Sequence, residues 1–316
     1  MARNLNLGVA QLGPVDGADS RQKTVGRMVE LVREAADRRT EFLVFPELAL
    51  TTFFPRHWAE DVSVADAYYE RSMPNPDVAP LFDAARAAGM GFYLGYAELK
   101  PDGQRFNTSI VVNRAGEIVG KYRKIHLPGH AEHRPDARSQ HLEKRYFEVG
   151  DLGFGVFDVD GHLMGMGLCN DRRWPETYRS MSLQSAEIAV FGFNTPSADP
   201  DRNDALTELS MFHHLLSIQA GAYQNSMWVA AAGKSGVEEG SHMIGGSAIV
   251  APSGELINRA STEGDELIVS KIDLDLAVQY RKAIFDFNAH RRTEAYGLIV
   301  ERRGWGDPLP LLRDRW

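Results

Sequence analysis

The chain's single cysteine stands among residues that favour chemistry. Cys169 is the only thiol in 316 residues, and it ends the apolar part of "GLCNDRRWPE" (167–176). Pro175 predicts that a helix begins there, with Asp171 as its cap, because proline suits the first turn and aspartate the preceding position. Asp171 is followed by two arginines, which oppose the helix dipole at this end. Their position therefore indicates another task, such as bidentate binding of a carboxylate.

The same surroundings favour a nucleophilic role for Cys169. Nearby guanidinium groups and a helix N-terminus are expected to lower the pKa of the thiol and to favour thiolate. The alternative is structural, since a free cysteine often packs in the core as a small apolar side chain. A thiolate that attacks a carbonyl also requires a base and a group that stabilises the oxyanion.

Two other stretches supply those groups. Glu47 ends the short apolar strand "FLVFPEL" (42–48), and a carboxylate held against Phe and Leu has a raised pKa. Lys124 follows the strand in "GKYRKIHLPGH" (120–130), where strand alternation places it on the same side as Tyr122 and opposite Arg123. Taken alone, each would be interpreted as a solvated charge at the end of a strand.

The elements that position these residues alternate between strands and helices. Hairpins are expected to turn at 114–116, at 160–161 and within 247–260, so the sheets are mixed rather than parallel, and the fold class is α/β. The expected strands are 5–12, 42–48, 91–99, 187–194, 227–233 and 266–273, and the expected helices are 21–38, 78–89, one from 174, and 205–223.

Composition narrows the class of protein. The net charge is −8, which disfavours nucleic acid and membrane surfaces as partners, because both reward a basic surface. One cysteine permits no intrachain disulfide, and no apolar run is long enough for a signal peptide or a membrane span, so a cytoplasmic location is expected. His126, His130 and His133 lie in a Pro/Gly loop without a metal-binding spacing, so no metal is expected.

These residues resemble a known family. Glu47 in "FPELALTTFFP", Lys124 in "GKYRKIHLPGH" and Cys169 in "CNDRRWPE" resemble the Glu–Lys–Cys triad of the nitrilase superfamily of carbon–nitrogen hydrolases. The surroundings are most similar to those of N-carbamoyl-D-amino acid amidohydrolases (D-carbamoylases). The further motifs occur in the same order over roughly residues 5–300: "FNTSI", "QHLEKRYFE", "GDLGF", "NTP", "FHHLLSIQAG", "YQN" and "AAAGK".

The resemblance implies a four-layer α-β-β-α sandwich without metal or organic cofactor. It makes residues 1–300 one carbon–nitrogen hydrolase domain and leaves 301–316 as a C-terminal tail or intersubunit arm. Members of the family assemble by packing α-layers together, so a homodimer or homotetramer is expected.

The resemblance also assigns roles. Cys169 is the nucleophile, Glu47 the general base and acid, Lys124 the stabiliser of the oxyanion, and Glu143 a second glutamate that orients the lysine. An arginine is expected to hold the α-carboxylate of the substrate. The positions that match the substrate pocket are Arg172, Arg173, Asn170, His126, His141, Asn194 and Thr195.

The expected reaction is hydrolysis of an N-carbamoyl-D-amino acid to the D-amino acid, ammonia and CO2 through a thioester. The alternatives are the same chemistry on N-carbamoyl-β-alanine, on L derivatives or on a simple amide. A catalytically silent carboxylate-binding protein on the same fold is a further alternative.

Overall fold

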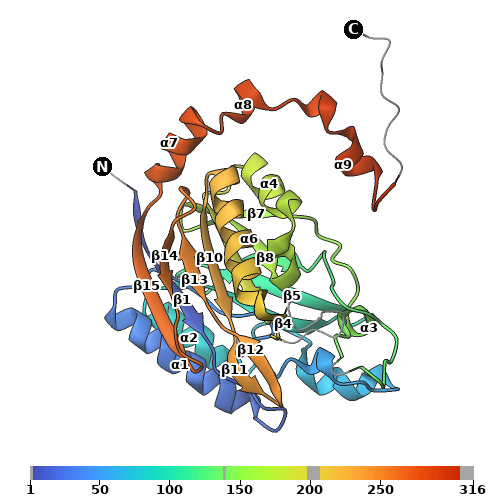
Figure 1. Ribbon diagram of the computed structural model, residues 1–316. Coiled ribbons are helices and arrows are strands. Elements are labelled where there is room, and N and C mark those ends of the chain that lie inside the picture. Colours follow the sequence, from blue (N-terminus) through green and yellow to red (C-terminus); the bar gives the residue numbers. More distant parts are fainter. Residues whose placement is uncertain (1–2, 138–139, 198–206, 307–316) are drawn as a thin grey trace.

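The computed structural model describes residues 3–137, 140–197 and 207–306, and two large sheets dominate them (Figure 1). The first sheet has the order β15-β1-β2-β4-β5-β6, with β3 paired to β4. Its central pairs, β1/β2 and β2/β4, are parallel, whereas the outer pairs are antiparallel. Its strands are β1 (Asn4–Gln11), β2 (Phe42–Val44), β3 (Tyr69–Glu70), β4 (Gly91–Leu99), β5 (Arg105–Val112), β6 (Ile118–Arg123) and β15 (Glu266–Asp273).

The second sheet has the order β14-β13-β10-β9-β8-β7. Strands β8 and β10 run parallel to β9, and the remaining pairs are antiparallel. The strands are β7 (Val156–Val159), β8 (His162–Leu168), β9 (Ile188–Phe193), β10 (Trp228–Gly233), β13 (Ala248–Val250) and β14 (Leu256–Arg259). All three predicted hairpins and the mixed character of the sheets are confirmed.

The two sheets pack face to face between two layers of helices. One apolar cluster lies between the sheets and contains Leu7 and Val9 of β1 with Val190 of β9. Successive side chains of a strand point to opposite faces of the sheet, so Ala10 of β1 faces away from the second sheet. It lies in a second cluster with helices α1 (Arg21–Asp37) and α2 (Ala79–Ala87). A third cluster joins the second sheet to α4 (Pro175–Leu183) and α6 (Ser210–Asn225). These clusters give the α-β-β-α layering that was predicted.

Shorter elements complete the described part of the chain. A small hairpin of β11 (Ser235–Glu238) and β12 (Ser241–Ile244) was not predicted from the sequence. The 3-10 turns are η1 (Phe54–Arg56), η2 (Val62–Tyr68), η3 (Cys169–Arg173) and η4 (Thr293–Ala295), and α3 (Glu143–Tyr146) is a single turn. None of the helices in the described ranges has the length and apolar character needed to cross a bilayer.

The chain after β15 forms three helices that were not predicted from the sequence. Helices α7 (Asp275–Ala283), α8 (Phe287–His290) and α9 (Gly297–Glu301) follow one another in an arc beside α4 and α6 (Figure 1). A cavity of about 610 Å³ lies between this arc and the two helices. Residues 307–316 and the expected helical start at 205 lie outside the described residues. The role of 301–316 stays a prediction.

Candidate active site

Glu47 follows β2 at a point where both sheets approach its backbone. A Cβ on Gly95 of β4 would lie 2.7 Å from Glu47 Cα, and one on Gly192 of β9 would lie 2.4 Å from Glu47 N. Glycine at both positions lets the chain pass between the sheets, and the next residue, Leu48, has a positive φ of 43°. The side chain of Glu47 is completely buried.

Lys124 follows β6 directly and points into the interior, as strand alternation predicted. Its ammonium nitrogen Nζ lies 2.7 Å from Glu47 Oε1 and 2.6 Å from Glu143 Oε2, and all three side chains are fully buried. Burial favours the neutral amine, but the charges of Glu143 and Glu47 outweigh it and raise the pKa of Lys124 above its ordinary value. Lys124 is therefore a permanent cation at neutral pH.

The pKa values of the two carboxylates that share Lys124 are shifted in opposite directions. Burial raises the pKa of Glu47, and the nearby charge of Glu143 adds to this effect. Burial also disfavours the anion of Glu143, but Lys124 and His141 outweigh it and lower the pKa of Glu143; His141 Nε2 lies 3.1 Å from Glu143 Oε1. Two carboxyl groups whose pKa values are shifted apart in this way provide one group for proton transfer and one fixed anion.

Two asparagines hold the carboxylate of Glu47. Asn107 Nδ2 donates to Glu47 Oε1 at 2.8 Å, and the backbone N–H of Asn194 donates to Glu47 Oε2 at 2.9 Å. The side chain of Asn194 also donates to the carbonyl of Glu47 at 2.8 Å. Asn194 was a predicted site residue, whereas Asn107 was not, although it stands in the motif "FNTSI".

Cys169 begins the turn η3 directly after β8, in a conformation rare for a non-glycine residue. Its φ is 41°, which places the thiol at a sharp bend between strand and helix. The thiol donates to the carbonyl of Asn194 at 3.3 Å, and Cys169 is 3% exposed. Burial, followed by the charge of Glu47, raises the pKa of the thiol despite Lys124 and Arg172. The expectation of a lowered thiol pKa was therefore wrong, because sequence neighbours do not reveal burial.

Asp171 fixes this turn. The prediction that it caps α4 was wrong. Its carboxylate accepts from Leu168 N at 2.9 Å and from Tyr122 OH at 2.8 Å. It also accepts from the backbone N–H of His126 at 3.0 Å and lies 2.8 Å from ring atom Nδ1 of that histidine. The first helical residue of α4 is Pro175, and its N-cap residue makes no side-chain capping bond.

Arg172 is fully buried against the cysteine. Its Nη1 donates to the carbonyl of Cys169 at 2.7 Å and lies 3.7 Å from Sγ, and its Nη2 donates to Thr195 Oγ1 at 2.8 Å. Its Nε donates to His214 Nδ1 at 3.0 Å, and burial together with Arg172 lowers the pKa of His214 well below its ordinary value. Within the described residues Arg172 has no carboxylate partner, so its charge acts on Cys169.

The predicted residues fall into two groups in space. One network of hydrogen bonds and buried contacts joins Glu47, Lys124, Glu143, Cys169, Arg172, His141, Asn194 and Thr195. His126 and Asn170 lie beside it, where Asn170 Nδ2 donates to the carbonyl of His126 at 3.2 Å and both residues line a separate cavity of about 480 Å³. Arg173 is half-buried. It lines neither that cavity nor the cavity that His141 and Pro196 border.

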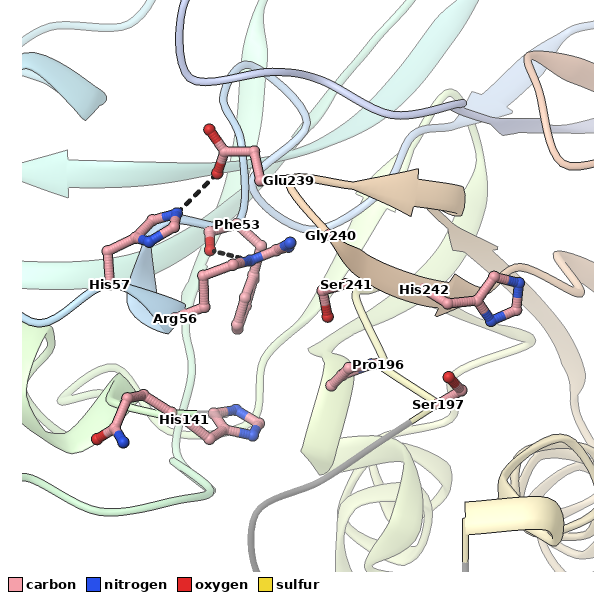
Figure 2. A pocket seen from close by; sticks show the side chains of 11 residues that line it. Phe53, Arg56, His57, His141, Pro196, Ser197, Glu239, Gly240, Ser241 and His242 are labelled. Atoms are coloured by element: carbon pink, nitrogen blue, oxygen red, sulfur yellow. Dashed lines mark hydrogen bonds and ion pairs between the residues drawn. The ribbon is translucent and has the colours of Figure 1, made fainter. Parts of the chain in front are cut away.

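A cavity of about 370 Å³ borders the first group at His141, and Figure 2 shows the side chains that line it. It reaches the network through His141 and through Pro196, which follows Asn194 and Thr195. The loop around η1 and the β11–β12 hairpin form the other walls. The loop lies in the motif "VFPELALTTFFPR", but none of its residues after Glu47 was predicted as a site residue, and the hairpin was not singled out from the sequence. The lining residues are Phe53, Arg56, His57, Gln140, His141, Pro196, Ser197, Glu239, Gly240, Ser241 and His242.

Comparison with known proteins agrees with this geometry. The family model described as carbon–nitrogen hydrolase matches residues 6–282. The chain belongs to the nitrilase superfamily of carbon–nitrogen hydrolases. It is therefore a hydrolase of carbon–nitrogen bonds, and the predicted superfamily is confirmed.

Similar proteins within this superfamily carry several activities. A nitrilase of Pyrococcus abyssi is 30% identical over 87% of this chain and 93% of its own. An N-carbamoylputrescine amidase of Arabidopsis thaliana is 26% identical over 91% of this chain and 93% of its own. A solved carbon–nitrogen hydrolase from Helicobacter pylori superimposes with a TM-score of 0.82 at 24% identity, over 95% of this chain and 99% of that one. The fold is thus shared across enzymes with different substrates.

Proposed function

We propose that this carbon–nitrogen hydrolase converts N-carbamoyl-D-amino acids to D-amino acids, ammonia and CO2. The chemistry is supported by the buried lysine between two carboxylates next to Cys169. The substrate is supported by the ordered motifs that resemble D-carbamoylases, from "VFPELALTTFFPR" to "AAAGK".

In the first step Glu47 takes the proton of Cys169 and the thiolate attacks the ureido carbon. A base is required because the pKa of the thiol is raised. The raised pKa of Glu47 makes this carboxylate a stronger base for that proton. Lys124 has three N–H donors, and among the described residues two have partners, which leaves one for the oxyanion. The backbone N–H after Cys169 is a second donor, and loss of one such donor typically costs about 10²–10³-fold in rate.

Glu47 then gives its proton to the departing ammonia, and a thioester with Cys169 remains. Water, activated by the same glutamate, hydrolyses this thioester and releases the thiol. The product is a carbamic acid, which loses CO2 to leave the free amino acid. No cofactor enters these steps.

Positioning roles follow for the neighbouring residues. Glu143 is the second anion that binds Lys124. Asn194 binds both the carboxylate of Glu47 and the thiol of Cys169. Arg172, anchored by Thr195 and His214, stabilises negative charge on the sulfur. His126, Asn170 and Arg173 remain predicted contacts of the substrate.

The alternatives are other substrates for the same chemistry, namely N-carbamoyl-β-alanine, L derivatives or a simple amide. The relatives include N-carbamoylputrescine amidases, but Arg56 in the cavity disfavours a cationic substrate. Intact Glu47, Lys124 and Cys169 disfavour a silent carboxylate-binding protein.

The deciding experiment measures ammonia release from N-carbamoyl-D-phenylglycine, its L enantiomer and N-carbamoyl-β-alanine, with Cys169→Ala as the control. Turnover of the D compound alone supports the proposal. If only the L or β-alanine compound reacts, the mechanism stands and the substrate assignment fails. Turnover by Cys169→Ala would overturn the mechanism.

We also propose assembly into a homodimer or homotetramer through the α-layer. Helix α6 exposes apolar side chains on its outer face, where Phe212 is 57% and Leu216 is 51% exposed. Such a face favours contact with another protein surface. The double change of Phe212 and Leu216 to Glu is expected to yield monomers in light scattering; an unchanged mass would contradict this interface.

A further inference from the structure

Arg56 lies in the wall of the cavity that His141 and Pro196 border, and hydrogen bonds to Phe53 and Glu238 hold it there. Its Nε donates to Phe53 O at 3.0 Å, its Nη2 donates to Glu238 Oε1 at 2.8 Å, and its Nη1 donates to the carbonyl of Glu238. The guanidinium carbon lies 5.7 Å from the ring centroid of Phe53, and the side chain is 10% exposed. In Figure 2, Arg56 and His57 lie on one side of the cavity, and Pro196, Ser197 and His242 on the other.

The carboxylate that holds Arg56 is shared with a second buried cation. Glu238 is fully buried and also accepts from Lys234 Nζ at 2.9 Å, from Phe53 N at 2.7 Å and from Val15 N at 3.0 Å. Lys234 is fully buried and donates its other described bond to Thr51 O. Glu238 serves two cations, and Glu239 supplies the second negative charge near Arg56, so the site binds Arg56 firmly without covering its donors that face the cavity.

The one carboxylate that lines the cavity already has its own donors. Glu239 Oε2 lies 2.7 Å from His57 Nε2 and accepts from Thr52 Oγ1 at 2.8 Å, and its other oxygen accepts from Gly17 N at 2.8 Å. Arg56 itself uses three of its five N–H donors, and across residues 3–137, 140–197 and 207–306 the other two have no partner. A rigid guanidinium with two unused donors at a cavity wall is suited to a carboxylate.

Arg172, one of the two arginines predicted to line the substrate pocket, has other partners. Each nitrogen of Arg172 donates to a neighbour, namely Cys169 O, Thr195 and His214, and the side chain does not reach the cavity surface. Arg56 likewise donates once from each nitrogen, so the two arginines differ in access rather than in their number of bonds. Arg172 is completely buried, whereas Arg56 lines the cavity.

We propose that Arg56 binds a carboxylate of the substrate and thereby determines specificity for anionic substrates. The Lys234–Glu238 pair positions Arg56 for this contact. The proposal rests on the proposed function, since it names the residue that recognises the substrate of the same site. It applies to the α-carboxylate or to an acidic side chain, which present the same chemistry.

The test uses the single thiol as a probe that needs no turnover. N-iodoacetylglycine and N-methyl-iodoacetamide differ only in a carboxylate, and both alkylate Cys169. The ratio of their alkylation rates, followed by mass spectrometry, is compared in the wild type and in Arg56→Met, Arg56→Lys and Arg145→Met. Arg145 is the matched control, because it packs 3.7 Å from the ring centroid of Trp58 and bonds Ala59 O outside the cavity lining.

Arg56→Met is expected to lower this ratio about 10- to 100-fold, the effect of losing a hydrogen bond to a charged group. Arg56→Lys keeps the charge but not the fork of donors and should retain only part of the ratio, and Arg145→Met all of it. General loosening of the fold would change the two rates together and leave their ratio unchanged. N-iodoacetyl-D-glutamate distinguishes the two carboxylates, since a drop confined to this reagent assigns Arg56 to the side chain. An unchanged ratio for both anionic reagents would overturn the proposal.

Kinetics separate this result from the proposed function. Arg56→Met should raise the KM for N-carbamoyl-D-phenylglycine about 10- to 100-fold with little change in kcat, because Arg56 lies away from the reacting atoms. If the wild type does not turn over this compound, the proposed substrate fails while the alkylation ratio still decides the role of Arg56. A fall in kcat with an unchanged KM would contradict a binding role.

Discussion

The backbone nitrogen of Glu47 lies so close to Gly192 that a Cβ on the glycine would be 2.4 Å from it. Glu47 lies in the turn that follows β2 of the first sheet, and Gly192 lies in β9 of the second. The position of the proposed base therefore depends on how closely the two sheets pack.

Gly192→Ala is expected to reduce kcat at least about 10-fold, because the added methyl meets backbone that cannot yield without moving Glu47. The same crowding should lower the free energy of unfolding by about 1–3 kcal/mol. Gly26→Ala is the matched control, since Gly26 lies on the exposed face of α1 and an added Cβ meets nothing within 4 Å. It should leave kcat unchanged; full activity in Gly192→Ala would show that Glu47 tolerates the shift.

Glu143→Gln should move the acid limb of the pH–rate profile to lower pH. The charge of Glu143 raises the pKa of Glu47, so its removal lets Glu47 ionise more readily. The rate should also fall, since Lys124 keeps only one of its two anions. Measuring kcat/KM from pH 4 to 9 tests this, and an acid limb that stays in place would argue against coupling of the two carboxylates.

Glu47→Gln should abolish turnover while making Cys169 easier to alkylate. The charge of Glu47 raises the pKa of the thiol, so a neutral glutamine lowers that pKa and increases the thiolate fraction near neutral pH. Iodoacetamide labelling across a pH series measures the effect as a shift of the titration to lower pH. Glu30→Gln, on the exposed face of α1, should leave it unchanged. A shift to higher pH in Glu47→Gln would contradict the assigned cause.

Glu98→Gln should weaken the fold at neutral pH and much less in acid. Burial raises the pKa of Glu98, but bonds from Arg123 and Lys121 outweigh it and bring the value to about 2, below the ordinary 4.5. Its stabilising effect is therefore complete above pH 4.5 and is lost as the pH falls toward 2. Urea unfolding should show a loss of about 1–3 kcal/mol at pH 7 that shrinks by pH 3. An equal loss at both pH values would exclude a charge effect.

Much of the site follows from local patterns in the sequence. Strand alternation in "GKYRK" correctly turned Lys124 inward, but the prediction that its neighbours stay solvated was wrong for Arg123, which is buried and binds Glu98. The apolar run before Glu47 correctly indicated a buried carboxylate with a raised pKa. The fold class followed from the alternation of strands and helices, with the hairpins as evidence for mixed sheets.

The predictions that failed concerned contacts between residues that are distant in the chain. Asp171 has the sequence position of a helix cap, yet its partners come from Tyr122 and His126. Arg56 and Glu238 are 182 residues apart, and no local pattern joins them. The β11–β12 hairpin is polar at several positions and lacks the apolar alternation that indicates a strand.

The proposed general base and the oxyanion-stabilising lysine come from the first half of the chain, and the proposed nucleophile comes from the second. Glu47 and Lys124 follow β2 and β6 of the first sheet, and Cys169 follows β8 of the second. A backbone break between α3 and β7 would give two fragments, one with Glu47, Lys124 and Glu143 and one with the thiol, and neither would hold a complete centre. Reassociation of the fragments is expected to rebuild it, since the two sheets share one apolar interface. The enzyme is thus a natural candidate for a split reporter, in which ammonia release signals that two fused partners have met.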